Sequence, residues 1–448
     1  MGSFMSAIEP VELPQQGAEA TRHEGRPRVS ITFCLVVLAL VIRLGLLVYL
    51  FGIPFTQPAT INDESFANET TNVAATLATG HGFSSPMISV VDGDPHMGPS
   101  AWIAPVYPIF CAIIFRLLQP FSSASFSVIF LTQCVISAFT IIPLMRIARF
   151  TTGATVGYIS SFLWAVFPWF SKWAVTWVWE ISLTAFLFTW LIWYALRLQQ
   201  PAARRTWIGF GALWGFALLV NPSVMTLLPV SAVWIVLRRK KLGQPWLRNG
   251  LLSATVCLAV IGPWLIRNRV VFGEWIFLRD NFGFEFALGN FHGSNGRGWA
   301  PYHPTKNPEE LKAYGTLGEL NYIETKTQMG KQFVSEYPQE FAALTSKRIF
   351  WFWDGSAVNY TDGIPGYWMP LTYGVFSILL VPSLLLACCK RLVGWPLFLG
   401  AILLYPIPYY LTYSQLRYRH AIEPLMLLLV VYAIPDTISR FRSKLAAS

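Results

Sequence analysis

Apolar runs of about 20 residues recur along the whole chain, and no other feature constrains its fold as strongly. Only helices or closed barrels satisfy every backbone polar group in a bilayer, and about 20 apolar residues make one spanning helix. Composition agrees, because 54% of the residues are hydrophobic and only 12% are charged. We therefore predict an all-α polytopic membrane protein with about ten spans, at 31–52, 125–145, 153–170, 178–198, 207–220, 222–237, 249–266, 367–389, 394–412 and 421–435.

The net charge of +10 is spread over small basic groups beside these spans. The dense groups are Arg22/Arg26/Arg28, Arg146/Arg149, Arg204/Arg205, Arg238/Arg239/Lys240/Lys241, Lys390/Arg391 and Arg440/Arg442/Lys444. Basic residues of this kind mark the cytoplasmic ends of spans, so these groups and both chain ends are expected inside. Such short, separate groups differ from the continuous basic surface of a nucleic-acid-binding protein, and no nucleic-acid partner is expected.

The segment 103–118 is apolar but short, and two prolines stand near its start. Between two cytoplasmic basic groups the chain must cross the membrane an even number of times. The first two spans already make the pair between Arg28 and Arg146, and a third crossing would place Arg146 outside. We therefore predict that 103–118 is a re-entrant or juxtamembrane helix on the outer face.

This topology divides the chain into four parts: a cytoplasmic tail (1–30), a transmembrane module that includes the outer loop 53–124 (31–266), an extracytoplasmic helical loop (267–366), and C-terminal helices with a short cytoplasmic tail (367–448). In the second outer loop we expect amphipathic helices at 311–314 and 318–350, interrupted at Pro338. A short outer turn is expected at 171–177. A re-entrant hairpin, hinged at Asn221–Pro222, is the alternative to two spans within 206–237.

Acidic residues on the outer face are the candidates for catalysis. Asp63 and Glu64 open the first outer loop, ahead of an expected amphipathic helix that ends near Gly80. Helix capping is the structural alternative for these two acids, because carboxylates favour helix N-termini. Glu180 stands among aromatic residues at the start of the fourth predicted span. A carboxylate at that depth is costly, so a catalytic role is weighed against contact with lipid headgroups.

Arginines near the outer membrane surface are the candidates for phosphate binding. Arg43 lies well inside the first span, where a buried cation indicates either function or a structural ion pair. Arg267 and Arg269 follow one span, and Arg417 and Arg419 precede another. The planar guanidinium binds two phosphate oxygens at once, which favours a phosphate site over ordinary headgroup contact.

The other polar residues of the outer loops carry weaker signals. His81, His96 and Tyr107 in the first loop are candidates for the acceptor side of a site. The histidines of the outer loops lack the spacing of a zinc site, so no metal ligand is assigned. No cofactor is expected with certainty, although carboxylates on the outer face could hold a divalent cation. The sequence has no Walker or dinucleotide-binding motif.

The order of several short motifs is that of a known superfamily. These motifs are Asn62-Asp63-Glu64, residues 74–83, Gly98-Pro99-Ser100-Ala101, Pro105-Val106-Tyr107-Pro108, Pro263-Trp264 with Arg267-Asn268, Asn281-Phe282-Gly283, Leu288-Gly289-Asn290, and Arg417-Tyr418-Arg419-His420 with Glu423-Pro424. From residue 31 to residue 438 the chain resembles the GT-C superfamily of integral-membrane glycosyltransferases. Within it, the chain is most similar to bacterial relatives of protein O-mannosyltransferases and of the aminoarabinose transferase of lipid A.

The resemblance implies transfer of one sugar, with inversion, from a polyprenyl-phosphate carrier to an acceptor hydroxyl on the extracytoplasmic face of the inner membrane. It implies that Asp63 is the catalytic base and that Glu180 is a second acid of the site. Basic residues would hold the carrier phosphate. The partners would be the lipid-linked sugar, a lipid, glycan or protein acceptor, and membrane lipids. The chain lacks the large soluble C-terminal domain of oligosaccharyltransferases, so the acceptor stays open.

Two other classes of function compete with this interpretation. A transporter or flippase of a lipid-linked sugar would use the same outer arginines, but its acids are expected in the middle of spans. A non-catalytic scaffold would have no reason to gather acids and arginines on one face. The positions of Asp63 and Glu180 at the outer edge favour the transferase.

Overall fold

The computed structural model describes residues 30–52, 68–88, 97–296, 302–355 and 368–447. Within these ranges the chain is helical, and its β-structure is limited to one isolated bridge between Ser84 and Pro99. This confirms the predicted all-α class.

The helices follow one another closely along the chain. The first half contains α1 (Ile31–Phe51), α2 (Asn68–Ala78), α3 (Val106–Leu118), α4 (Ser123–Phe139), α5 (Ile141–Thr151), α6 (Ala154–Val166), α7 (Pro168–Thr176), α8 (Ile181–Leu198), α9 (Arg204–Val220) and the 3₁₀ helix η2 (Pro222–Thr226). The second half contains α10 (Leu227–Lys241), α11 (Leu247–Phe272), α12 (Phe282–Gly289), α13 (Pro308–Leu317), α14 (Glu319–Glu336), α15 (Pro338–Asp354), α16 (Trp368–Cys389), α17 (Trp395–Leu404), α18 (Ile407–Leu411), α19 (Leu416–Arg419) and α20 (Glu423–Ala447).

Each of the ten predicted spans falls on a helical segment. Of the described helices, five are long and apolar enough to cross a membrane: Ile31–Phe51, Ser123–Thr151, Ile181–Leu198, Leu247–Phe272 and Thr372–Cys389. Shorter apolar helices occupy Val106–Leu118, Ala154–Val166, Trp395–Leu411 and Glu423–Pro435. The chain is therefore a polytopic membrane protein, and η2 marks the predicted break at Asn221–Pro222.

Helix α3 occupies the segment for which a non-spanning helix was predicted. Its 13 residues reach about 20 Å at 1.5 Å per residue, short of the roughly 30 Å hydrocarbon core. Arg116 near its C-terminal end donates a hydrogen bond to the carbonyl of Ala78 at the end of α2, at 3.1 Å. α3 is thus packed against α2, the other helix of the first outer loop.

The helical break after α6 differs from the prediction. Residues 171–177 were expected to form a turn, but most of them belong to α7. The break lies instead at Phe167, whose extended backbone precedes Pro168 at the first position of α7. Proline has no N–H to continue the ladder of α6, which is why the chain turns there.

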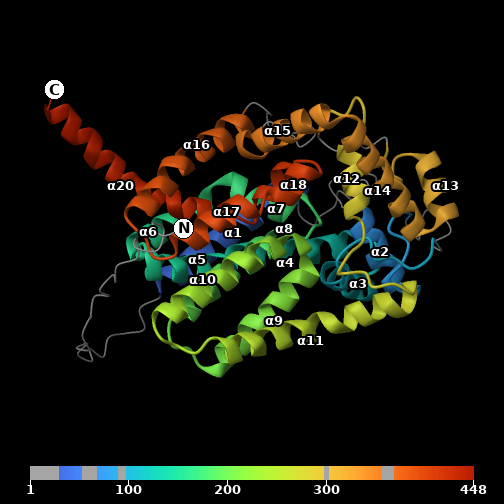
Figure 1. Ribbon diagram of the computed structural model, residues 1–448, viewed down its shortest axis with the longest axis horizontal. Helices are drawn as coiled ribbons and strands as arrows, with labels where there is room; N and C mark the ends of the chain where they lie inside the picture. The colour runs from blue at the N-terminus through green and yellow to red at the C-terminus, as the bar shows by residue number, and fades with distance from the viewer. Residues whose placement is uncertain (1–29, 53–67, 89–96, 297–301, 356–367, 448) are drawn as a thin grey trace.

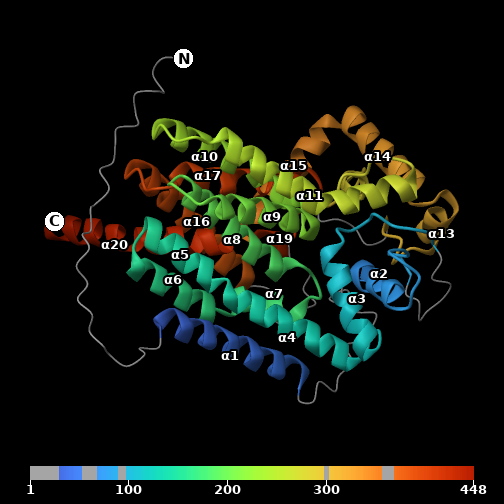
Figure 2. The same cartoon turned by 90° about the horizontal axis from the view of Figure 1, so that it is seen from below.

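The helices of both long loops gather at one end of the molecule. α2, α3, α12, α13 and α14 lie together at the right of Figure 1, whereas the end of α20 lies at the opposite end. Figure 2 shows α1 along one side, beside α4 and α6, with its N-terminal end also at the far left. The two outer loops predicted from the charge pattern therefore meet on the same side of the bundle.

Close helix packing in the bundle depends on small residues. α9 and α11 lie against each other at Gly211 and Gly215, where a Cβ at Gly215 would come 2.6 Å from the Cβ of Val260. Small residues spaced by four allow two membrane helices to approach closely. This contact holds α11 against α9. The C-terminal end of α11 then leads into the second outer loop.

Candidate active site

An open pocket lies where the second outer loop meets the bundle. It is formed by the start of α8, the segment before α12, α12 itself and the residues of α18 and α19. Its charged lining side chains are Glu180, Arg279, Glu285 and Arg417. Its tyrosines are Tyr405, Tyr409, Tyr413 and Tyr418. Two cations, two acids and several hydroxyls therefore face one space at the loop end of the molecule.

Glu180, predicted as a catalytic acid, lines this pocket. It is the N-cap residue of α8, where the backbone turns away from α7. Asn221, at the break between α9 and η2, donates an amide hydrogen bond to Glu180 Oε1 at 3.4 Å. Arg279 and Arg417 both stabilise its charge electrostatically. The acid is thus directed into the pocket by the two chain breaks that surround it.

Arg417, predicted to bind the carrier phosphate, also lines the pocket. Its guanidinium lies 4.6 Å from the ring centre of Trp177 and 4.7 Å from that of Trp179. Only 8% of its surface is exposed, and its Nε has no hydrogen-bond partner among the described residues. Aromatic faces stabilise a cation without using its N–H groups. Arg417 therefore lines the pocket with a donor that no protein group in the described structure occupies.

Arg279 is a pocket cation that the sequence analysis missed. It is half-buried and lies between the end of α11 and the start of α12, after Leu278 with its positive φ of 66°. The Leu278 carbonyl accepts a hydrogen bond from Trp264 Nε1 at 2.6 Å, which holds this strained residue in place. Arg279 lies two residues before the motif Asn281-Phe282-Gly283. The motif therefore indicated this region, although no pattern indicated Arg279 itself.

Glu285 is the second pocket residue that the sequence analysis missed. It stands in the first turn of α12, and Asn281 Nδ2 donates to its Oε1 at 2.9 Å. Its Oε2 is buried and has no partner among the described residues. Burial raises the pKa of Glu285, and the positive charge of Arg279 and the nearby Tyr413 hydroxyl oppose this shift. The pocket therefore holds a second carboxylate, which Asn281 fixes through one oxygen.

The acids at the start of the first outer loop, Asp63 and Glu64, lie outside the described residues, as does His96. The next acid along the chain, Glu69, is described in the first turn of α2 and forms an ion pair with His303 Nε2 at 3.1 Å. The charges of Arg417 and Glu69 interact. The first outer loop therefore enters α2 within the electrostatic reach of the pocket.

Arg267 and Arg269 do not line the pocket. Arg267 donates to the carbonyls of Phe83 at 3.0 Å and Ser100 at 2.7 Å, and its guanidinium lies 4.8 Å from the ring centre of Trp264. It therefore ties α11 to the first outer loop. Arg269 is exposed. We expected both Arg-x-Arg pairs at one phosphate site. Of their four arginines, only Arg417 lines the pocket.

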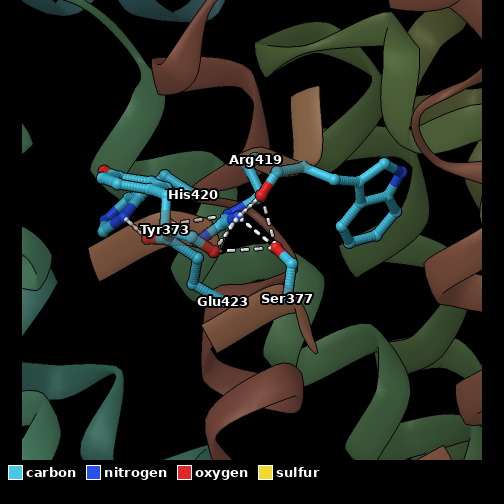
Figure 3. Close-up of polar contacts among 6 residues, drawn as sticks. Tyr373, Ser377, Arg419, His420 and Glu423 are labelled. Carbon is cyan, nitrogen blue, oxygen red and sulfur yellow. Dashed lines mark hydrogen bonds and ion pairs between the residues drawn. The ribbon is translucent and has the colours of Figure 1, made fainter. Parts of the chain in front are cut away.

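Arg419 faces away from the pocket into a buried polar cluster (Figure 3). Its Nε lies 3.4 Å from Glu423 Oε1, and its Nη1 donates to Ser377 Oγ at 2.8 Å. His420 Nδ1 contacts the other oxygen of Glu423 at 2.7 Å, and the Arg419 guanidinium lies 4.2 Å from the ring centre of Tyr373. Arg419 thus anchors α19 and the start of α20 to α16.

Arg43 is fully buried in the bundle, away from the pocket. Its guanidinium donates to Ser137 Oγ at 2.8 Å and to the Trp164 carbonyl at 3.2 Å. Trp164 stands four residues before Pro168, so its carbonyl would otherwise lose the N–H partner that a continuous helix provides. Arg43 satisfies carbonyls at the end of α6, which is a structural use of this cation.

The acceptor-side candidates also lie outside the pocket where they are described. The Tyr107 hydroxyl donates to Gln133 Oε1 at 2.5 Å, and Gln133 Nε2 donates to the Trp177 carbonyl at 3.0 Å. Tyr107 thereby links α3 to the segment that enters α8. His81 is exposed just after α2, where its Nδ1 lies 2.9 Å from Thr79 Oγ1.

A metal site of three or more His, Cys, Asp or Glu side chains does not occur among the described residues. The possibility that carboxylates of the outer face hold a divalent cation stays untested.

Comparisons with known proteins agree with this architecture. A sequence profile of the family "Dolichyl-phosphate-mannose-protein mannosyltransferase" matches residues 103–266. None of the curated proteins matches the sequence. An oligosaccharyltransferase of Archaeoglobus fulgidus, crystallised with Zn and sulfate, is 11% identical and has a TM-score of 0.50 over 93% of this chain and 50% of that chain.

Two further structures are similar. The archaeal oligosaccharyltransferase AglB from A. fulgidus, in complex with an inhibitory peptide and a dolichol-phosphate, is 12% identical with a TM-score of 0.50, over 93% of this chain and 52% of that chain. ArnT from Cupriavidus metallidurans, bound to undecaprenyl phosphate, is 14% identical with a TM-score of 0.42, over 86% of this chain and 77% of that chain. The chain thus spans about half the length of the archaeal enzymes.

The helical bundle with its loop-covered end shares the fold of the archaeal oligosaccharyltransferases, and the resemblance to the GT-C superfamily had predicted such an all-helical membrane fold. Within that superfamily, residues 103–266 are similar to the dolichyl-phosphate-mannose-protein mannosyltransferases.

Proposed function

We propose that the protein transfers a single sugar, with inversion, from a polyprenyl-phosphate carrier to an acceptor hydroxyl. The carrying observation is the pocket in which Arg279 and Arg417 face Glu180 and Glu285. A glycosyl transfer from a lipid phosphate needs cations for the leaving phosphate and carboxylates for the hydroxyl and the sugar. The similar AglB was solved with a dolichol-phosphate, which supports a lipid-phosphate donor.

The carrier phosphate would bind to Arg417 and Arg279. Arg417 offers an unpartnered Nε, and its aromatic neighbours hold the side chain in one orientation. As the bond between the sugar C1 and the phosphate oxygen breaks, the leaving phosphate keeps the electron pair. Charge-assisted hydrogen bonds from arginine stabilise this developing charge. Arg267 and Arg419 would hold the chain around the site through their own contacts, Arg43 would stabilise the bundle, and no contact of Arg269 in the described structure links it to the phosphate.

Asp63 is proposed as the catalytic base, with Glu64 and Glu180 as further acids of the site. Asp63 precedes Glu69 by six residues, which span at most about 20 Å when extended, and Glu69 interacts with Arg417. In the transfer, the base takes the proton of the acceptor hydroxyl while the acceptor oxygen forms the new bond to C1. His81 and His96 of the first outer loop are proposed to contact the acceptor.

The site is proposed to open on the extracytoplasmic side of the inner membrane. The basic groups assigned to the cytoplasm flank the spans at their other ends, and the pocket lies at the end where the outer loops meet. A lipid tail could lie among the apolar helices while the polar head enters the pocket. The acceptor would be a lipid, a glycan or a protein.

Purified protein incubated with polyprenyl-phosphate monosaccharides, labelled on the sugar, tests the proposal directly. The wild-type protein is expected to release polyprenyl phosphate and pass the label to an acceptor extract from cell envelopes. Asp63→Ala should lower kcat by about 10²- to 10⁴-fold, the contribution of a general base. Lys331→Ala, an exposed change on α14, is the matched control.

Two outcomes would contradict the proposal. Full activity of Asp63→Ala would remove Asp63 from the chemistry. Movement of an intact sugar–carrier across vesicles, without loss of sugar from the carrier, would instead identify a flippase.

A further inference from the structure

Glu285 lines the pocket, and Asn281 holds one of its two carboxylate oxygens. Asn281 Nδ2 donates to Oε1 at 2.9 Å, whereas Oε2 is buried without a partner among the described residues. A buried acceptor that lacks a hydrogen bond carries a free-energy cost, which a ligand donor at that position would remove. Because Glu285 lines the pocket, a ligand bound there is the group that could supply such a donor.

The backbone that carries Glu285 is tightly held. Helix α12 packs against α14 so closely that a Cβ at Gly283 would collide with Thr327 Oγ1. A Cβ at Gly289 would collide with the Thr412 carbonyl. Arg348 of α15 donates to the carbonyl of Gly289 at the end of α12, and to that of Leu411 at 3.2 Å. Glu285 is therefore placed by rigid elements rather than by a loose loop, as a specificity residue requires.

The charges around Glu285 indicate which part of a lipid-phosphate sugar it meets. The carboxylate would repel the carrier phosphate. The phosphate is instead expected to bind Arg417 and Arg279, which line the same pocket. The sugar is joined directly to that phosphate, and its hydroxyls are hydrogen-bond donors. Phe282 and Tyr413, which also line the pocket, supply aromatic surface beside the carboxylate. The sugar is thus the part of the donor whose chemistry fits Oε2.

We propose that Glu285 binds a hydroxyl of the transferred sugar through Oε2 and so selects the sugar of the donor. Asn281 is the positioning residue that turns Oε2 toward the pocket by holding Oε1. This inference rests on the proposed function for the identity of the donor, but it concerns binding of the sugar rather than its transfer.

The test compares the binding of carriers with and without a sugar. The dissociation constant of undecaprenyl phosphate is measured with the purified full-length protein in nanodiscs. It is compared with those of undecaprenyl phosphate that carries mannose, glucose, N-acetylglucosamine or arabinose. In the wild-type protein at least one sugar-bearing carrier is expected to bind about tenfold more tightly than undecaprenyl phosphate, as one buried charge-assisted hydrogen bond provides. Glu285→Ala should remove this difference without weakening the binding of undecaprenyl phosphate, because the variant loses only a negative charge that repels the phosphate. Glu285→Gln, which keeps the shape of the side chain, should reduce the difference only in part.

The controls separate a sugar contact from a general effect on the pocket. Glu336→Ala, an exposed change on α14, should bind every carrier like the wild-type protein. Asn281→Ala should reduce the sugar-dependent difference, because Oε1 loses the amide that orients the carboxylate. Retained binding of undecaprenyl phosphate shows that each variant is folded.

Three results would overturn the inference. The wild-type protein could bind no sugar-bearing carrier more tightly than undecaprenyl phosphate, or Glu285→Ala could keep the tighter binding of the sugar-bearing carrier. The third is an equal loss of binding of undecaprenyl phosphate and of its sugar-bearing forms in the Glu285 variants. Transfer of label is measured separately. A protein that shows the sugar-dependent difference without transferring sugar would retain the role of Glu285 and contradict the proposed glycosyl transfer.

Discussion

Arg417 and Arg419 are two residues apart in α19, yet their guanidinium groups serve opposite sides of the chain. Arg417 lies 4.7 Å from the ring centre of Trp179 and faces the pocket. Arg419 lies 3.4 Å from Glu423 Oε1 in a buried cluster. One residue of the Arg-x-Arg pair is therefore available to a ligand, and the other fixes the backbone that carries it. The following predictions separate these two uses of arginine.

Arg417→Ala is expected to lower kcat/KM for the carrier by about 10- to 100-fold, since a hydrogen bond to a charged group contributes about 1.5–3 kcal/mol. The kcat/KM of Arg417→Lys should fall between those of the wild-type protein and Arg417→Ala. Lysine keeps the charge but loses the planar group that stacks on Trp177. Steady-state kinetics with labelled carrier measures both, with Lys331→Ala as the reference. Wild-type kcat/KM in Arg417→Ala would show that the phosphate binds elsewhere.

Arg419→Ala is expected to act on stability. Removing one partner of a buried ion pair leaves the carboxylate of Glu423 without its cation and typically costs about 3–5 kcal/mol. Thermal unfolding in detergent measures the loss. The double variant Arg419→Met/Glu423→Leu should be more stable than the sum of the single changes implies, because neither charge is left alone. Strict additivity would show that the pair is not coupled.

Arg43 and Pro168 are expected to be energetically coupled. Arg43→Met should destabilise the protein by about 1.5–3 kcal/mol, because the Trp164 carbonyl loses its charged donor. Pro168→Ala restores an N–H four residues after Trp164 and should reduce the cost of Arg43→Met. A double-mutant cycle on thermal stability measures this coupling. Equal costs of Arg43→Met in both backgrounds would rule out the proposed compensation.

The ion pair between Glu69 and His303 predicts a pH-dependent contact between the two outer loops. Burial alone would lower the pKa of His303, but the hydrogen bond and charge of Glu69 outweigh it, and the pKa is raised from 6.5. Burial alone would raise the pKa of Glu69, but the bond to His303 outweighs it, and the pKa is lowered from 4.5. The pair therefore contributes fully between about pH 4.5 and 6.5.

Above this range the contribution of His303 is lost as the pH rises through its raised pKa, and below it the contribution of Glu69 is lost as the pH falls through its lowered pKa. Glu285 and Lys306 also act on His303, with opposite signs. The stability difference between the wild-type protein and His303→Gln should be largest near about pH 5.5 and shrink above neutrality. A difference that stays constant with pH would exclude the pair as its source.

The positions of the helices could be predicted because their signals are local. Apolar length, basic ends and proline breaks each depend on a few neighbouring residues, and they located helices at the ten predicted positions, the short α3 and the break at Asn221–Pro222. The turn expected at 171–177 was wrong because Pro168 moved the break upstream while the apolar pattern continued. Glu180, which lines the pocket, could be selected as a candidate because a carboxylate at the edge of a span is conspicuous in the sequence.

The partners of each charge could not be predicted, because they come from distant parts of the chain. Arg267 and Arg417 have similar sequence surroundings, yet one binds loop carbonyls and the other lines the pocket. Arg279 and Glu285 carry no strong local motif and become site residues only where α12 packs against α14 and the segment at Thr412.

The sequence by itself therefore determined a polytopic helical membrane protein with its polar loops at one end, because apolar length and charge placement act locally. The tertiary structure decided which of those loop charges share a pocket, because burial and pairing depend on which helices lie side by side.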